Sequence, residues 1–226
     1  MSRHGRLNRG SAMSFVLAAA ICALLSGCEA TAALLSAVEA TVAAAEGTDD
    51  ATDDATDDPP PGPVGVEWAR SVSAGLSGSR FEGVAVGGSG AVYAVGSQEG
   101  TGDYTYGTKS VSGGYGGGNA VLVAYDENGA AQWARTTGTA PAASQFVSVA
   151  TSGTGDVYVA GYQNGDMEFT YAGVSVTAPN TGDNSLLLKF DASGAAQWGR
   201  TLTASSGTTS FADVAVDDTG KVYVCG

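Results

Sequence analysis

Short apolar runs separated by Gly, Asn and Asp recur through the last two thirds of the chain, and this pattern predicts many short β-strands. Where the pattern is clearest, tight turns at 152–155 and 191–194 join the predicted strands in pairs. The four strands of this unit are expected at residues 146–150, 156–161, 185–190 and 196–201. Together they predict a four-stranded antiparallel meander.

Two of these strands, at 157–160 and 186–188, are apolar at consecutive positions, so both faces of their sheet must be covered. Radial stacking of four-stranded sheets, as in a β-propeller, meets this demand and protects the strand edges. A linear solenoid of stacked units meets it too. The longer connection at 162–184 is expected to hold one further short strand near 169–176.

The same residues return every 65 positions, which identifies an internal repeat. We interpret the repeated aromatic residues as packing between successive sheets. An isolated fourth strand at 66–72, two full copies and half of a third predict that the sequence is a fragment or that several chains assemble. The matched positions are Trp68, Trp133 and Trp198; Arg70, Arg135 and Arg200; Phe81, Phe146 and Phe211; Tyr93, Tyr158 and Tyr223; and Gly96, Gly161 and Gly226.

The segments 126–133 (DENGAAQW), 191–198 (DASGAAQW) and 155–161 (GDVYVAG) resemble the seven-bladed β-propeller repeats of bacteria. This resemblance covers residues 65–226 and implies an all-β array of four-stranded blades. The Asp-x-x-Gly turn before Trp is also similar to the tryptophan-docking repeat of quinoprotein propellers. The repeat is longer than a typical blade of either family because of its long middle connection.

The N-terminus has the layout of a secretory signal peptide, in which arginines precede a short apolar run. The run ends in Leu25-Ser26-Gly27-Cys28, which resembles the bacterial lipobox. That resemblance implies cleavage between Gly27 and Cys28 and lipid attachment to the Cys28 sulfur, with acyl chains that hold the protein on a membrane. Since Glu29 rather than Asp follows, we expect the outer membrane or cell surface of the bacterial envelope.

Residues 28–64 are expected to connect the lipid to the repeats, so the predicted organisation is 1–27, 28–64 and 65–226. Apolar residues within 30–46 have helical spacing and predict a short helix that packs or self-associates. Three Thr-Asp-Asp motifs and a proline run follow, which predict an extended, solvated linker. Ca²⁺ binding by these carboxylates is an alternative, although the run lacks the Gly and bidentate Glu of a calcium loop.

The formal net charge of −13 would repel phosphates, which argues against a nucleic-acid partner. The single histidine, His4, lies in the expected signal peptide, so the mature chain would lack a Ser-His-Asp triad and imidazole metal ligands. The cysteines imply no disulfide framework. Cys225, on a predicted strand, is expected to be a small buried residue.

Asp126 and Asp191 precede turn glycines at equivalent places, which predicts Asx turns rather than catalytic acids. The long connections at 97–119 and 162–184 differ in sequence although their flanks agree, so they are expected to supply binding loops, and 113–118 is expected to be a flexible hairpin end. Carboxylates beside aromatic residues in these loops suit sugars, peptides or calcium. The candidate residues are Glu99, Asp103, Tyr104, Tyr106, Tyr115, Asp166, Glu168, Phe169 and Tyr171.

These observations predict a lipid-anchored envelope protein whose repeats bind other proteins or glycans, with no catalytic residue and no cofactor. Two other functions remain open at this point. One is a propeller enzyme, either a quinoprotein-like oxidoreductase or a carboxylate-dependent glycan hydrolase or lyase, which would need a cofactor or a convergent acid pair. The other is a structural surface or assembly component.

Overall fold

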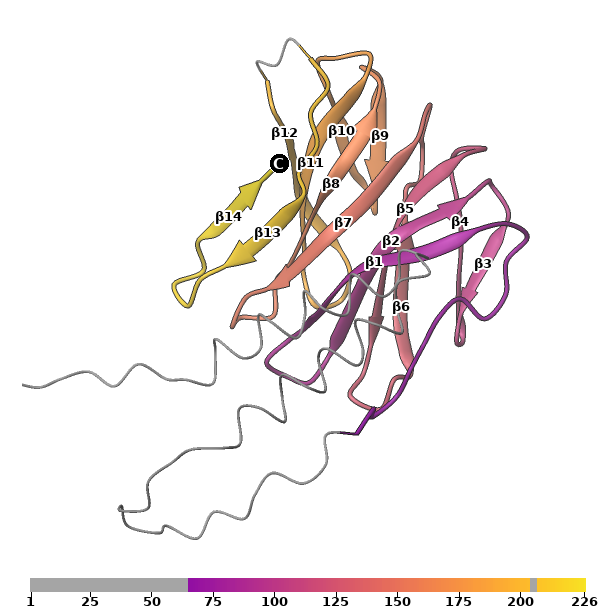
Figure 1. Ribbon diagram of the computed structural model, residues 1–226, viewed down its shortest axis with the longest axis vertical. Coiled ribbons are helices and arrows are strands. Elements are labelled where there is room, and N and C mark those ends of the chain that lie inside the picture. Colours follow the sequence, from indigo (N-terminus) through magenta and orange to yellow (C-terminus); the bar gives the residue numbers. More distant parts are fainter. Residues whose placement is uncertain (1–64, 204–206) are drawn as a thin grey trace, which may run out of the picture. The chain divides into compact units, whose positions relative to one another are not determined.

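The computed structural model describes residues 65–203 and 207–226, and these residues are all-β with no helix (Figure 1). Two antiparallel sheets have four strands and three have two. The first large sheet holds β1 (Ser79–Val86), β2 (Val92–Glu99), β5 (Gly118–Tyr125) and β6 (Ala131–Thr136). The second holds β7 (Ser144–Thr151), β8 (Val157–Asn164), β11 (Asp183–Phe190) and β12 (Ala196–Thr201).

Along the chain, a two-stranded hairpin lies between the second and third strands of each large sheet, which still pair with each other directly. These hairpins are β3 (Asp103–Tyr106) with β4 (Lys109–Ser112), and β9 (Glu168–Tyr171) with β10 (Val174–Thr177). The third small sheet pairs β13 (Asp213–Val216) with β14 (Val222–Cys225). In the part of the chain that is described, no helix is long and apolar enough to span a membrane.

The prediction of an all-β chain with four-stranded antiparallel sheets is confirmed, and the predicted strands of the second copy match β7, β8, β11 and β12. The long connection holds two strands rather than the one expected. A two-residue turn with positive φ at both Ala172 (46°) and Gly173 (90°) joins β9 to β10, and such a turn suits the twist of a hairpin. The described sheets do not close into a ring.

The first strands of the three copies pack against one another, so β7 lies between β1 and β13 (Figure 1). Side chains at equivalent positions contact each other directly, since the Ser148 hydroxyl donates to the Asp213 carboxylate (2.5 Å). The Thr151 hydroxyl likewise donates to the Val86 carbonyl (3.2 Å). Neighbouring repeats are therefore joined by contacts between positions 65 residues apart.

Glycine is required where the first strand of each copy bulges against the second. The register of β1 and β2 shifts between Phe81 and Gly83, and a Cβ at Gly96 would overlap the Arg80 carbonyl. Gly161 meets the Gln145 carbonyl in the same way. Only glycine allows the two backbones to approach this closely, which explains its return every 65 residues.

Apolar side chains cover both faces of the second sheet. One face shares a core with the first sheet, in which Leu122 and Val95 pack with Phe146 and Leu188, all at most 1% exposed. The opposite face packs against β13 and β14 through Tyr158, Ala160 and Val214. These contacts explain the consecutive apolar residues of the central strands, whose two faces both lie in cores.

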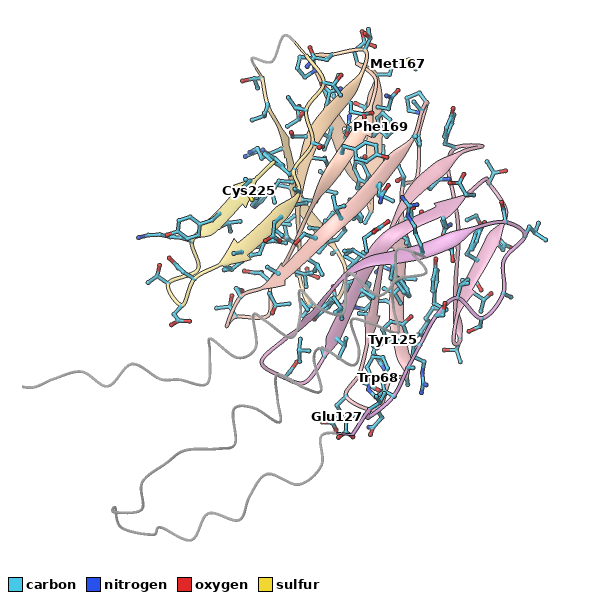
Figure 2. The ribbon with its side chains drawn as sticks, in the orientation of Figure 1. Trp68, Tyr125, Glu127, Met167, Phe169 and Cys225 are labelled. Carbon is cyan, nitrogen blue, oxygen red and sulfur yellow. The ribbon has the colours of Figure 1, made fainter. Side chains whose placement is uncertain are left out.

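The prediction that Cys225 is buried is wrong, because its side chain is exposed. Its counterparts Val95 and Ala160 are fully buried in strands that are paired on both edges. Cys225 lies in β14, for which the described residues supply only β13 as a neighbour (Figure 2). Burial at this position thus depends on the next strand of the sheet and not on the residue itself.

Candidate functional site

Each complete repeat carries an Asp-x-x-Gly turn before its last strand, and the aspartate organises it. Asp126 Oδ1 accepts hydrogen bonds from the backbone N–H groups of Asn128 (3.0 Å) and Ala130 (2.9 Å). Asp191 forms the same pattern with Ser193 and Ala195. The predicted Asx turns are confirmed.

Hydrogen bonding also changes the chemistry of Asp191. The Ser193 hydroxyl, followed by the backbone N–H of Ala195, stabilises the charged carboxylate and lowers its pKa. A general acid needs a raised pKa, so this carboxylate is suited to holding its turn and not to giving up a proton near neutral pH.

The tryptophan and arginine of each repeat dock on this turn in the next repeat. The Trp68 indole N–H donates to the Glu127 carbonyl (2.9 Å), and the Arg70 Nε donates to the Gly129 carbonyl (2.7 Å). Figure 2 shows Trp68 beside Glu127 and Tyr125, whose ring centroid is 5.6 Å away. We call such a tryptophan and arginine a docking pair.

The second docking pair repeats this geometry. The Trp133 indole N–H donates to the Ala192 carbonyl (2.9 Å), and the Arg135 Nε donates to the Gly194 carbonyl (2.7 Å). The guanidinium stacks on the indole ring, 5.3 Å from its centroid. Both bonds span 59 residues, so the pair links one repeat to the next.

The turn glycine is required for two reasons. Gly194 has φ +79°, a left-handed conformation that other residues adopt at a cost. It also lies beneath the docked indole, where an added Cβ would approach Trp133 Cδ2 to 2.7 Å. Gly129 has the same conformation and the same distance to Trp68. The glycine therefore serves both the turn conformation and the docking contact.

The third docking pair is formed, but the described residues place no turn against it. Arg200 stacks on Trp198 at 5.5 Å, and Trp198 lies 6.1 Å from Tyr158, much as Trp133 lies 5.9 Å from Tyr93. Arg200 donates to the adjacent Gly199 carbonyl (3.2 Å). Within residues 65–203 and 207–226, the Trp198 indole N–H and the Arg200 Nε have no hydrogen-bond acceptor.

Four of the predicted binding residues are buried aromatic side chains of the hairpins: Tyr104, Tyr106, Phe169 and Tyr171, each at most 1% exposed. The Tyr106 hydroxyl donates to Gln98 Oε1 (3.0 Å), and burial raises its pKa. Tyr171 bonds Gln163 in the same way (3.3 Å), and its pKa is also raised by burial. A ligand reaches none of these rings without displacing the hairpin, so their contacts are those of a core.

The two long connections differ in sequence but form the same hairpin in the same register, with Asp103, Tyr104 and Tyr106 at the positions of Glu168, Phe169 and Tyr171. Each hairpin bridges to the preceding segment, since Ala74 pairs with Thr105 and Thr137 with Tyr171. Each hairpin therefore pairs with the segment that comes just before the first strand of its own sheet.

The remaining predicted residues do not converge on one site. Glu99, Asp103, Asp166 and Glu168 are exposed, and Tyr115 is half-buried. Asp103 accepts a hydrogen bond from the Ser112 hydroxyl within its own hairpin. Across the described ranges, no three His, Cys, Asp or Glu side chains gather as metal ligands would. Cys28 and Gly27 lie outside the described residues, as does the Asp-rich segment considered for Ca²⁺.

Sequence reasoning missed two pairs of buried amides that position the hairpins. The Asn119 side chain donates to the carbonyls of Tyr115 (2.8 Å) and Gly117 (2.8 Å), and its oxygen accepts from the Tyr115 N–H (2.9 Å). Asn184 binds its own loop similarly. Asn119 and Asn184, like Gln98 and Gln163, are 65 residues apart, and this interval was the available signal.

The segment 113–118 is not the flexible hairpin end that was expected. It wraps around the buried Asn119 side chain, and a Cβ at Gly113 would overlap the Gly100 carbonyl. A Cβ at Gly114 would overlap the Gly138 carbonyl. The glycines are needed here because the backbone packs closely against neighbouring carbonyls, so the segment is a packed loop.

A shallow cleft of about 410 Å³ lies at the joint between the two complete repeats. The half-buried Trp133 supplies aromatic surface next to the buried Tyr93, and Glu127 and Gln132 supply exposed polar groups. The Gln132 amide is held in place by a bond to Asp126 Oδ2 (2.9 Å). Aromatic rings beside carboxylate and amide groups can bind sugar rings or peptide segments, and this combination makes the cleft the best candidate for ligand binding.

The chain matches no protein-family profile and no curated protein.

Proposed function

We propose that this protein is an exported, lipid-anchored protein of the bacterial envelope whose repeats form a β-propeller-like array that binds other proteins or glycans without catalysing a reaction. The docking pair carries this proposal. Trp68 with Arg70 and Trp133 with Arg135 join successive repeats by the same bonds, so the repeats are related by a constant step. A constant step between four-stranded sheets is the organisation of a propeller and also of a linear solenoid, so it supports a regular array of blades, for which we favour the propeller-like form.

The repeated polar residues support a scaffold and not an enzyme. Asp126 and Asp191 hold turns, Gln98 and Gln163 hold tyrosines, and the lowered pKa of Asp191 opposes proton transfer. Residues that repeat are used for architecture, so binding falls to exposed positions such as Glu127 at the cleft. The net charge of −13 favours neutral or basic partners over anionic ones.

The anchor rests on Arg3, Arg6 and Arg9, the apolar run and the Leu25-Ser26-Gly27-Cys28 motif. Diacylglyceryl on Cys28 together with acylation of the new amino group would hold the protein durably, because several chains bind a membrane far more strongly than one. The Asp- and Pro-rich segment would then keep the repeats away from the lipid surface. Because Glu29 rather than Asp follows Cys28, the proposal assigns the array to the outer membrane or the cell surface.

The anchor is tested by expressing the full chain and its Cys28→Ala variant in a bacterial host and separating membranes from soluble protein. The wild type is expected in the membrane fraction with incorporated labelled palmitate, and the variant without the label. Equal labelling of both proteins would refute lipidation at Cys28.

The binding surface is tested on a glycan array and on envelope extracts with Gln132→Ala. This variant removes an amide that lines the cleft. Gln197→Ala is a matched control, because Gln197 makes the same bond to its own aspartate (2.9 Å) but does not line the cleft. Loss of a bound ligand with Gln132→Ala alone supports the cleft as the binding site. Equal loss or equal retention with both variants would refute it.

A further inference from the structure

The docking pairs that join the repeats do not identify which repeat they join. Trp68 and Trp133 each donate to a backbone carbonyl, and so do Arg70 and Arg135. The two turns present these carbonyls in the same way, because an aspartate with the same backbone hydrogen bonds shapes each turn. A given docking pair would therefore fit the turn of either complete copy.

A second set of contacts joins the first strands β1 and β7, which lie side by side (Figure 1), and is centred on Gln145. Gln145 Oε1 accepts hydrogen bonds from Arg80 Nη2 (3.2 Å) and from the Tyr162 hydroxyl (3.2 Å). Its Nε2 donates to Glu82 Oε1 (3.0 Å), and Glu82 forms an ion pair with Arg80. We call Arg80, Glu82 and Gln145 the joint network, because its charged residues lie in the first copy and its amide in the second.

The residues of the joint network differ from copy to copy. The equivalent positions, at intervals of 65 residues, hold Arg80, Gln145 and Ser210, and Glu82, Val147 and Ala212. The position between them is phenylalanine in all three copies. The charged residues are therefore confined to the first copy and the amide to the second, while the core residue beside them repeats.

The joint between the second and third copies has different polar partners. The Ser148 hydroxyl on β7 donates to the Asp213 carboxylate on β13 (2.5 Å) and accepts from the Val214 N–H (3.3 Å). The first copy has Gly83 at the position of Ser148, so β1 cannot offer this hydroxyl to Asp213. Each of the two joints within the described residues thus has its own set of polar contacts.

Burial makes the joint network selective. Gln145 is 8% exposed, so its amide requires partners from the protein. If the second copy packed against another second copy, Val147 would replace Glu82 and the amide N–H would lose its acceptor. If the third copy packed against the first, Ser210 would replace Gln145. A buried polar group without a partner is costly, so both wrong arrangements are disfavoured.

The ion pair of the network suits selection better than stability. The Arg80 side chain is 65% exposed, and an exposed ion pair adds little to the free energy of unfolding. Its position is nevertheless fixed, because Gln145 binds both Arg80 and Glu82. The buried amide therefore recognises the charged pair of one particular copy.

We propose that the joint network is a specificity-determining contact that selects the second copy as the neighbour of the first. The docking pairs hold adjacent copies together, and the joint network determines which copies are adjacent. A single buried polar residue fixes the register of coiled coils in the same way. Repeats with the same strands and the same docking pairs would otherwise pack in several orders, within one chain or between chains. The inference goes beyond the proposed function, because it depends on neither the lipid nor the cleft.

Disulfides between equivalent positions report which copies are neighbours. The Thr151 hydroxyl bonds the Val86 carbonyl, so Val86→Cys and Thr151→Cys should pair when the second copy packs against the first. Val216→Cys places a thiol at the equivalent position of the third copy, and its pairing with position 86 reports the wrong order. The full chain carries these three substitutions, with its native cysteines replaced by serine, and is refolded in a glutathione redox buffer. Peptide mapping by mass spectrometry gives the ratio of 86–216 to 86–151 disulfides.

An exchange of residues tests selection. Gln145→Ser with Ser210→Gln moves the amide from the second copy to the third at constant composition. We expect the ratio to rise at least about threefold over the parent and over Gln145→Ser alone, which removes the amide without offering it elsewhere. Lys189→Gln breaks an ion pair with Asp156 (2.8 Å) inside the second copy and should leave the ratio unchanged. An unchanged ratio after the exchange, or an equal rise in all variants, would overturn the proposal.

A double-mutant cycle tests the contact in the full chain without added thiols. Arg80→Met and Gln145→Met are made singly and together, and the unfolding equilibrium is measured in denaturant. Because each side chain is the partner of the other, we expect a coupling of at least about threefold in the unfolding equilibrium constant. Additive effects of the two substitutions would overturn the proposal.

Discussion

The turn glycine of the second docking contact gives the sharpest test of how the repeats are held together. Replacing Gly194 by Ala has two effects, since φ +79° is unfavourable for Ala and the new Cβ would approach Trp133 Cδ2 to 2.7 Å. Gly155 is a matched control. It has φ +87° in the turn between β7 and β8, and a Cβ there meets no atom closer than Ala192 Cβ at 3.8 Å.

The backbone cost is shared by both variants and is about 1–2 kcal/mol for a left-handed Ala. Gly194→Ala must also displace the indole or compress its contacts, which costs about 1–3 kcal/mol. If the indole moves, the Trp133–Ala192 hydrogen bond is lost as well, at about 1 kcal/mol. We therefore expect Gly194→Ala to be less stable than Gly155→Ala by about 2–4 kcal/mol.

Thermal unfolding followed by circular dichroism measures this difference. For a chain of this length about 2–4 °C in the midpoint corresponds to 1 kcal/mol, so Gly194→Ala should melt at least about 4 °C below Gly155→Ala. Tryptophan emission of the folded Gly194→Ala protein should also shift to longer wavelength, because the Trp133 indole becomes more exposed to water. Equal midpoints and an unchanged emission spectrum would refute the docking contact as a stabilising joint.

Three further predictions follow from the same contacts. Trp133→Phe should cost about 1 kcal/mol more than Trp198→Phe, because among the described residues the Trp133 indole donates to a neighbouring repeat and the Trp198 indole does not. Equal denaturant midpoints would contradict this. Tyr125→Phe should leave the free energy of unfolding unchanged or raise it, as measured by chemical denaturation. The Tyr125 hydroxyl is buried without a hydrogen-bond partner, and the second copy has Phe190 at this position. A clear loss of stability would contradict this prediction. The Ser193 hydroxyl and backbone hydrogen bonds lower the pKa of Asp191 below 3.8 in the folded protein. The ionised Asp191 therefore stabilises the fold above pH 3.8, and this contribution is lost as the pH falls through the folded-state pKa. Asp191→Asn should therefore show a smaller loss of stability in acid than the wild type, and parallel pH profiles would contradict the assignment.

The roles of residues that act within a short stretch of chain could be predicted from the sequence. Asp126 and Asp191 were predicted to form Asx turns because this chemistry operates within five residues of chain. The strands of the second copy were predicted because apolar runs and turn residues alternate clearly there. The 65-residue interval marked Trp133 as a residue of the architecture, and its hydrogen bond to the next repeat agrees with this.

Contacts between distant segments could not be predicted from the pattern. Nothing local shows that Trp133 binds a carbonyl 59 residues away or that the side chain of Tyr106, in the β3–β4 hairpin, is buried. The interval does match Tyr106 with Tyr171 and Asn119 with Asn184, but insertion of a hairpin between two strands disguises the match. Cys225 was predicted wrongly because its burial depends on a neighbouring strand, which the identity of one residue does not report.

The intact mass of the native protein, extracted with detergent from bacterial membranes, tests the proposed function most directly. We expect an N-terminus at Cys28 that carries a diacylglyceryl group on sulfur and an acyl chain on the amino group, and peptide mapping would locate both. An uncleaved N-terminus, cleavage at another position, or an unmodified Cys28 would contradict the proposal of a lipid-anchored envelope scaffold.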